Sequence, residues 1–155
     1  MNTRSFEYIA GQILASPDNF NHLPEHQRFK AEIRLTHLVD RLTRTKQETS
    51  LIISALRKAT YNADPRIVWR ALDSLRRRKD FTREVCHNAG RMLRLDCDNA
   101  KQSAIDYLID AHFYAYVELV RPLMKAMPEC LSYPAKRYVE LAEDGDYNLF
   151  EAKDG

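Results

Sequence analysis

The chain has 155 residues, of which 45% are hydrophobic and 30% charged, so it is long enough for one domain or a short array of repeats. Its four glycines and six prolines are too few for an all-β protein or for a glycine-rich phosphate loop. The mean hydropathy of −0.52 argues against a membrane span, and the hydrophobic content argues against wholesale disorder.

The cysteines indicate the cellular compartment. Cys86, Cys97 and Cys130 are odd in number and form no Cys-x-x-Cys pair. A disulfide framework is therefore not expected, and no secretory signal pattern is found at the N-terminus. We expect a cytoplasmic protein.

Helix signals dominate the first half of the chain. Turn residues at 16–18 and 23–24 predict loops, and apolar residues at helical spacing predict a helix over 33–42. Residues 45–48 read as a capping box that opens the next helix, through residues 51–56.

The following helix has a clearer start. Asp64 is predicted to be its N-cap and Pro65 its first residue, and the apolar pattern continues to about Lys79. Asp80 is then expected to cap a further helix that runs to about Leu93.

The second half has fewer boundaries. Residues 99–127 contain one breaker, Pro122, and predict one long helix or two with a tight joint. Ser132 is expected to start a last helix that ends near Ala142. The alternation typical of strands is missing, so we predict an all-α chain of seven or eight helices.

A sequence pattern recurs at a fixed interval. Five evenly spaced segments carry it, at residues 5–9, 38–42, 71–75, 104–108 and 137–141. Their second and fifth residues are apolar throughout and share a helix face. A fixed period of about 20 to 50 residues is typical of stacked helical repeats.

Two segments resemble the helix opening of HEAT-like repeats. Residues 64–75 read Asp-Pro-Arg-Ile-Val-Trp-Arg-Ala-Leu-Asp-Ser-Leu, and residues 98–105 echo this pattern without the proline. The resemblance extends over residues 30–125, although the period is short for the family and Trp69 stands where a smaller residue or arginine is usual.

The resemblance implies an architecture. Residues 1–143 would form a short right-handed α-solenoid of stacked helical hairpins with a concave binding face, and residues 144–155 an acidic tail. A compact helical bundle is the alternative. HEAT-like arrays bind proteins most often and nucleic acids in a minority, and family membership implies no chemistry.

The net charge of +2 conceals an asymmetry. Residues 138–155 carry six acidic residues against one lysine, whereas residues 1–137 carry 23 basic against 16 acidic residues. The density of basic residues is highest over 66–101, which favours an anionic partner or a solvated helix end. The residues that would contact a partner or a nucleic acid are Arg66, Arg70, Arg76, Arg77, Arg78, Lys79, Arg83, Arg91 and Arg94.

Acidic residues occupy one position of the repeat. They are Glu7, Asp40, Asp73 and Asp106, the third residues of the first four segments. Such a ladder could pair with basic residues of neighbouring repeats or form an acidic stripe for a basic partner. In the tail, Tyr147 and Phe150 lie between acids and could anchor it to a basic groove.

Catalytic and metal-binding patterns are weak. No glycine-rich loop, His-Glu-x-x-His or Gly-x-Ser-x-Gly motif occurs, and no catalytic residue, metal site or cofactor is predicted. We expect a non-enzymatic protein-binding module, acting as an adaptor, an inhibitor or an immunity-type factor. The alternative is a helical-repeat protein that binds nucleic acid through residues 66–101.

Overall fold

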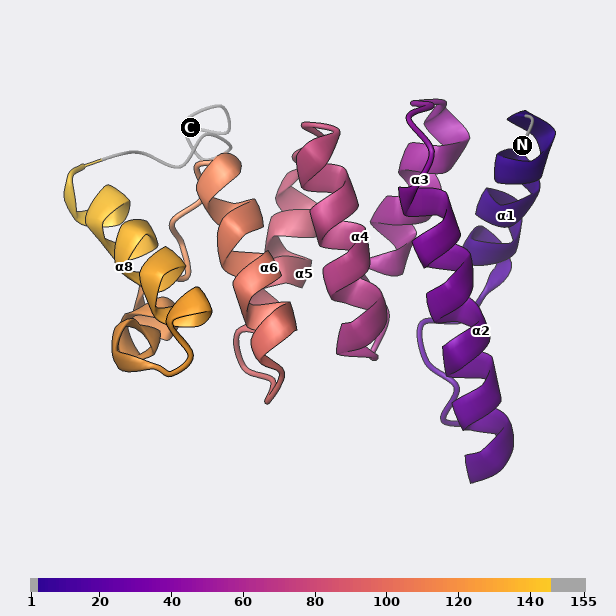
Figure 1. Ribbon diagram of the computed structural model, residues 1–155, viewed down its shortest axis with the longest axis horizontal. Helices are drawn as coiled ribbons and strands as arrows, with labels where there is room; N and C mark the ends of the chain where they lie inside the picture. Colours follow the sequence, from indigo (N-terminus) through magenta and orange to yellow (C-terminus); the bar gives the residue numbers. More distant parts are fainter. Residues whose placement is uncertain (1–2, 146–155) are drawn as a thin grey trace. The chain divides into compact units, whose positions relative to one another are not determined.

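The structure of the protein is a computed structural model that describes residues 3–145, and every regular element in this range is helical (Figure 1). The helices are α1 Thr3–Ala15, α2 Glu25–Thr43, α3 Ser50–Ala59, α4 Pro65–Arg77, α5 Arg83–Met92, α6 Asp98–Asp110, α7 Val117–Val120, the 3-10 helix η1 Arg121–Lys125 and α8 Glu129–Glu143. The prediction of an all-α chain with seven or eight α-helices is confirmed for the described residues. None of these helices is both long and apolar enough to cross a membrane.

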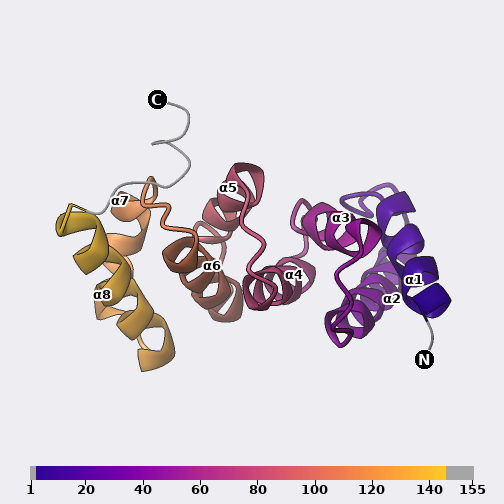
Figure 2. The same cartoon turned by 90° about the horizontal axis from the view of Figure 1, so that it is seen from above.

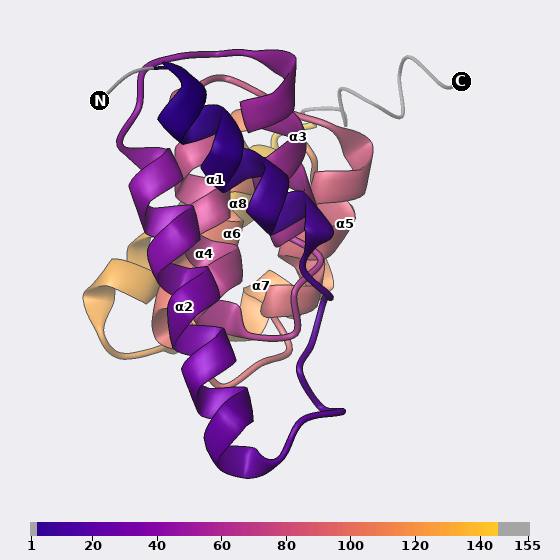
Figure 3. The same ribbon diagram turned by 90° about the vertical axis from the view of Figure 1, so that its right-hand side faces the viewer.

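The chain divides into two compact units, Met1–Asp80 and Phe81–Gly155. The first unit contains α1 to α4. In it, α1 packs against α2 and α3, and both of these pack against α4; Figure 3 shows α1 between α2 and α3. Its fully buried side chains come from the predicted apolar faces, and they include Val39, Leu42, Leu56, Leu72 and Leu75.

The start of α3 corrects the predicted capping box. Thr49, not Thr45, is the N-cap, and its side chain accepts a hydrogen bond from the backbone N–H of Ile52. The carbonyls of Thr45 and Gln47 accept hydrogen bonds from the Arg78 guanidinium. This contact holds the connection between α2 and α3 outside the helix. The capping-box pattern at residues 45–48 is therefore overridden by Arg78, which is distant in the sequence.

The boundaries of α4 follow the sequence closely. Asp64 is the N-cap, its carboxylate accepts from the N–H of Arg66, and Pro65 is the first helical residue, as predicted. The helix ends with Lys79 in the left-handed region, at a φ of 57°, and the N–H of Asp80 donates to the carbonyl of Leu75. This is the hydrogen bond of a Schellman cap, which usually has glycine at the left-handed position.

Asp80 does not cap α5, contrary to the prediction. Thr82 is the N-cap and accepts from the N–H of Val85. The Asp80 carboxylate instead accepts two hydrogen bonds from Arg57, at 2.9 Å from Nε and 2.6 Å from Nη2. Both carboxylate oxygens of Asp80 are thus engaged by Arg57, in a bidentate pair that directs the acid away from the start of α5.

The second unit contains α5 to α8. As Figure 2 shows, α6 lies between α5 and α8, and α7 and η1 pack against α8. Residues 99–127 form neither one long helix nor two helices with a tight joint, because α6 ends at Asp110 and the short α7 and η1 follow only after residues 111–116. His112 has a φ of 53°, and the N–H of Phe113 returns to the carbonyl of Leu108. Phe113 and Tyr114, which follow this turn, are buried core residues.

The last described helix begins earlier than predicted. It starts at Glu129, three residues before Ser132, and contains Pro134 in its interior. At this interior position a proline removes the hydrogen bond to the carbonyl four residues earlier, yet the helix continues to Glu143. The helix ends at Glu143, where the acidic tail was predicted to begin.

One backbone conformation, with a positive φ angle, recurs at the interval of the sequence pattern. Within residues 3–145, positive φ angles are found at Lys79, His112 and Gly145, whose spacing equals that of the five repeated segments. Each lies just beyond the end of α4, α6 or α8. Thr49 and Thr82, the side-chain caps of α3 and α5, are separated by the same interval. The stacking of hairpins into a right-handed solenoid stays a prediction.

Candidate functional site

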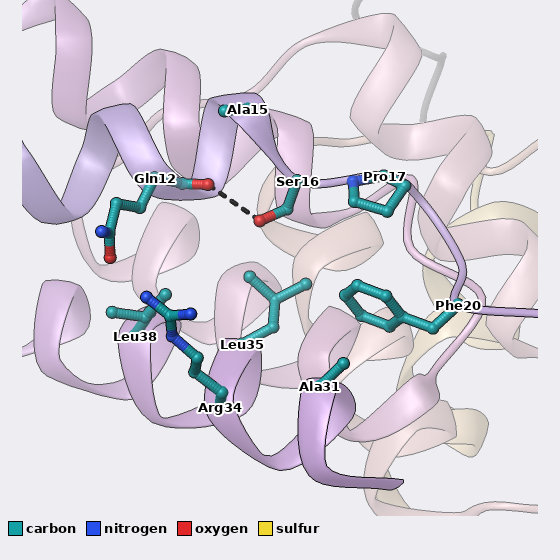
Figure 4. Close-up of a pocket in the computed structure, with 9 residues that line it drawn as sticks. All are labelled: Gln12, Ala15, Ser16, Pro17, Phe20, Ala31, Arg34, Leu35 and Leu38. Atoms are coloured by element: carbon teal, nitrogen blue, oxygen red, sulfur yellow. Dashed lines mark hydrogen bonds between the residues drawn. The ribbon is translucent and has the colours of Figure 1, made fainter. Parts of the chain in front are cut away.

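A mostly apolar pocket of the first unit lies between α1 and α2 (Figure 4). It has a volume of about 370 Å³ and is open to solvent. In Figure 4, Gln12 extends from α1 toward α2, and Leu35, Leu38 and Arg34 extend from α2. The lining is apolar apart from three residues, and it consists of Gln12, Ala15, Ser16, Pro17, Phe20, Ala31, Arg34, Leu35 and Leu38.

The connection between α1 and α2 forms one end of this pocket, and α3 holds the connection in place. Lys58 donates from Nζ to the carbonyl of Ser16 at 2.9 Å and to the carboxylate of Asp18 at 2.5 Å. The N–H of Ala63 also donates to the carbonyl of Asp18, at 2.7 Å. Phe20 is therefore presented to the pocket from a segment tied to the rest of the unit.

The two flanks of α2 differ in charge. On one flank, the acids Glu32 and Asp40 face α4, where Glu32 pairs with Arg66 at 3.3 Å and Asp40 lies 4.0 Å from Arg70. The other flank carries Lys30, Arg34 and His37, which are exposed. Sequence analysis did not select this basic flank, because its residues are spread over two helical turns and form no run.

The basic residues predicted in the first unit have mixed roles. Arg66 pairs with Asp64 and Glu32, and Arg70 stacks on the ring of Trp69 and donates to the carbonyl of residue 66. Arg78 is half-buried and donates to the hydroxyl of Ser74 and to three backbone carbonyls. Groups of the first unit thus already bind Arg66, Arg70 and Arg78.

The remaining predicted basic residues differ in exposure. Arg77 and Lys79 are exposed, and Arg76 is half-buried. Arg83 and Arg94 are exposed and Arg91 is half-buried, but these three belong to the second unit. The predicted basic residues of 66–101 are therefore divided between the two units.

The predicted acid ladder is distributed over four helices. Glu7 on α1 is exposed, whereas Asp40 on α2, Asp73 on α4 and Asp106 on α6 are half-buried. Asp40 accepts a hydrogen bond from Arg44 at 2.9 Å in addition to its proximity to Arg70. Of these two contacts of Asp40, the one with Arg70 joins neighbouring helices and the one with Arg44 is local, so pairing along the whole ladder stays a prediction. The predicted tail anchors, Tyr147 and Phe150, lie outside the described residues.

A polar and aromatic cluster lies in the second unit. The hydroxyl of Tyr116 is 2.6 Å from Nδ1 of His87, and burial raises the pKa of Tyr116. The ring of Tyr116 covers the backbone of Gly90, where an added Cβ would lie 2.2 Å from the ring. Tyr138 is buried and donates to the carbonyl of Phe113 at 2.7 Å. These contacts join α5, α8 and the connection after α6.

The cysteines within residues 3–145 differ in their burial. Cys86 is buried, and burial raises the pKa of its thiol to about 12, which keeps it protonated and unreactive. The adjacent His87 is exposed. Among residues 3–145, no group of three or more histidine, cysteine or acidic side chains could hold a metal ion.

Comparison with family models, curated proteins and solved structures finds no match to this chain. The α1–α2 pocket and its flanking charges are thus interpreted from their own chemistry.

The buried thiol makes stability depend on pH. Cys86 titrates near pH 9.0 when unfolded and near 12 when folded, so its contribution is complete below pH 9.0 and is lost as the pH rises toward 12. We expect the free energy of unfolding to fall by about 1.4 kcal/mol more between about pH 8 and pH 10 than in Cys86→Ala. Urea unfolding under reducing conditions measures this difference. The exposed Cys130 is the control: Cys130→Ala should retain the full pH dependence, and an equal flattening in both variants would contradict the assignment.

Proposed function

We propose that the protein is a non-enzymatic protein-binding module and that the α1–α2 pocket receives a peptide segment of its partner. The observation that carries this proposal is an open, mostly apolar pocket of about 370 Å³ on the first unit. Pockets of a few hundred Å³ with apolar walls and a few polar groups are typical of ligand sites. The proposed role is that of an adaptor, an inhibitor or an immunity-type factor in the cytoplasm.

The lining suits side chains better than a polar small molecule. Phe20, Leu35 and Leu38 offer apolar contact area, and Gln12 and Arg34 can orient a bound backbone or side chain. Because Lys58 fixes the connection that carries Phe20, the pocket is formed before a ligand binds. A preformed pocket reduces the entropy lost on binding.

The proposal includes a HEAT-like repeat architecture, with the hairpins stacked as a right-handed solenoid. Its support is the coincidence of the sequence period with the backbone: Lys79, His112 and Gly145 share a left-handed conformation and are spaced by one period. Repeats of one supersecondary unit place equivalent turns at equivalent positions.

Nucleic-acid binding through residues 66–101 is the alternative, and it has weaker support. Arg66, Arg70 and Arg78, three of the proposed contacts, already bind groups within the first unit. If this alternative holds, the variant Arg76→Glu, Arg77→Glu loses retention on DNA or RNA columns at low salt. The proposal of protein binding predicts no such retention in the wild type.

Affinity capture from the native host at physiological salt tests the leading proposal. We expect the wild type to retain a stoichiometric protein partner that survives nuclease treatment. Ala31→Gln, which fills the pocket, should lose this partner, whereas Ser54→Gln on the exposed surface of α3 should retain it. Retention of nucleic acid in place of protein, or equal capture by Ala31→Gln, would overturn the proposal.

A further inference from the structure

The charge in the lining of the α1–α2 pocket is basic. Arg34 is the single charged residue of the lining, and no acid lines the pocket. Lys30 and His37 lie four residues before and three residues after it on α2, so the three share one helix face. All three are exposed, and within residues 3–145 none of them forms an ion pair.

On the opposite flank of α2, by contrast, two charged side chains do have ion-pair partners. There, α4 supplies Arg66 to Glu32 and Arg70 to Asp40. Glu32 and Asp40 are thus paired with a neighbouring helix, whereas Arg34 lines the pocket and Lys30 and His37 are exposed to solvent. The unit leaves positive charge next to an apolar surface that is open to a ligand.

Building on the proposed function, we infer that the partner segment in the pocket is acidic and has an apolar anchor. A leucine or aromatic side chain enters between Phe20, Leu35 and Leu38, and carboxylates beside this anchor pair with Arg34 and with its basic neighbours on α2. Opposite charges across an interface raise the association rate and fix the orientation of the ligand.

The geometry sets the spacing of the acids. Lys30 and His37 are seven residues apart on α2, which corresponds to about 10 Å along the helix axis. An extended segment covers that length in about three residues. Acidic residues on both sides of a one- or two-residue apolar anchor therefore reach the basic flank, whereas a nucleic acid has no group that requires the apolar pocket.

Fluorescence anisotropy with the full-length protein tests the inference. The probe is a labelled, N-acetylated peptide with a Leu-Phe pair flanked on each side by two acidic residues. Two control peptides replace the acids by lysines or the Leu-Phe pair by two alanines. We expect the acidic Leu-Phe peptide to bind and both control peptides to bind at least about tenfold more weakly. Absence of binding, or equal binding of the lysine peptide, would overturn the inference.

Matched variants locate the binding site. Arg34→Glu should weaken binding of the acidic Leu-Phe peptide at least about tenfold, because it turns an attraction into a repulsion. Arg77→Glu changes an exposed arginine at the end of α4 in the same unit and should leave binding within about twofold. Equal losses in the two variants would indicate a general charge effect and would contradict the site.

Two further outcomes separate this inference from its alternatives. If Arg34→Glu retains the host partner that Ala31→Gln loses, the proposed function stands and the acidic segment is wrong. If the probe binds only to a full-length variant with Tyr147→Ser and Phe150→Ser, the pocket is occupied by the chain's own tail and not by a partner. A single-stranded DNA probe that competes with the peptide would likewise overturn the inference.

Discussion

Replacement of Arg78 by methionine is expected to lower the free energy of unfolding by about 3 kcal/mol, the largest effect of any single substitution considered for this protein. Arg78 donates to the carbonyls of Thr45 and Gln47 and, over a longer distance, to that of Leu42. Its Nε also donates to the hydroxyl of Ser74. Methionine fills similar space but offers no donor, so the connection between α2 and α3 loses its attachment to α4.

The environment of Arg78 explains why the loss is large. Burial lowers the pKa of its guanidinium, and the nearby charge of Glu48 opposes this effect. A half-buried cation with several hydrogen bonds stabilises a fold mainly by keeping its partners satisfied. Its fork of donors reaches carbonyls in several directions, which the single ammonium of a lysine cannot do. Arg78→Lys should therefore recover less than half of the lost stability.

Urea unfolding monitored by circular dichroism measures the effect. Arg77→Met is the matched control, because Arg77 is exposed and adjacent, and its expected change lies within about 0.5 kcal/mol. Equal destabilisation of the two variants would contradict the structural role of Arg78. The result also bears on nucleic-acid binding, because loss of binding in an Arg78 variant would then reflect loss of structure.

The second large effect is expected in the second unit, at Tyr138. Its side chain is fully buried, and its hydroxyl donates to the carbonyl of Phe113 at 2.7 Å and accepts from the N–H of Tyr116 at 3.3 Å. Tyr138→Phe leaves both backbone groups without this partner, and we expect a loss of about 2 kcal/mol. Burial raises the pKa of Tyr138 above its ordinary value, so the hydroxyl remains a donor at neutral pH.

Tyr133 provides the control for this prediction. It lies on the same helix, α8, but is 60% exposed. Tyr133→Phe should change stability by less than about 0.5 kcal/mol in the same urea titration. If Tyr138→Phe is as mild as Tyr133→Phe, the connection after α6 does not depend on the hydroxyl.

Local sequence signals predicted the helices well where one residue type determines the outcome. Asp64 and Pro65 specify the start of α4 because capping and proline geometry act within one turn. Predictions failed where a side chain distant in the sequence determines the position of a helix start. Thr45 looked like a cap but its carbonyl binds Arg78, and Asp80 looked like a cap but binds Arg57. Such partners are far away along the chain and leave no local pattern.

The candidate site was less predictable than the fold. The basic run at residues 76–79 is conspicuous in the sequence, yet the guanidinium of Arg78 is hydrogen-bonded to backbone carbonyls of the first unit. The flank formed by Lys30, Arg34 and His37 has a helical spacing that a search for charge runs overlooks. The α1–α2 pocket depends on the path of residues 16–24, which is set by Lys58, a residue 40 positions from Asp18. Its existence follows from tertiary contacts, and a helical pattern alone does not contain it.

The left-handed residues after α4, α6 and α8 have a consequence for how the chain can diverge. The turn at each of these sites is specified by a torsion angle, and lysine, histidine and glycine all adopt it. Glycine adopts this conformation without strain, whereas for other residues it costs about 1 kcal/mol. The geometry of these three turns can therefore persist when the amino acid at the left-handed position changes. These three turns therefore resemble one another in their backbone dihedral angles and not in their residue identity.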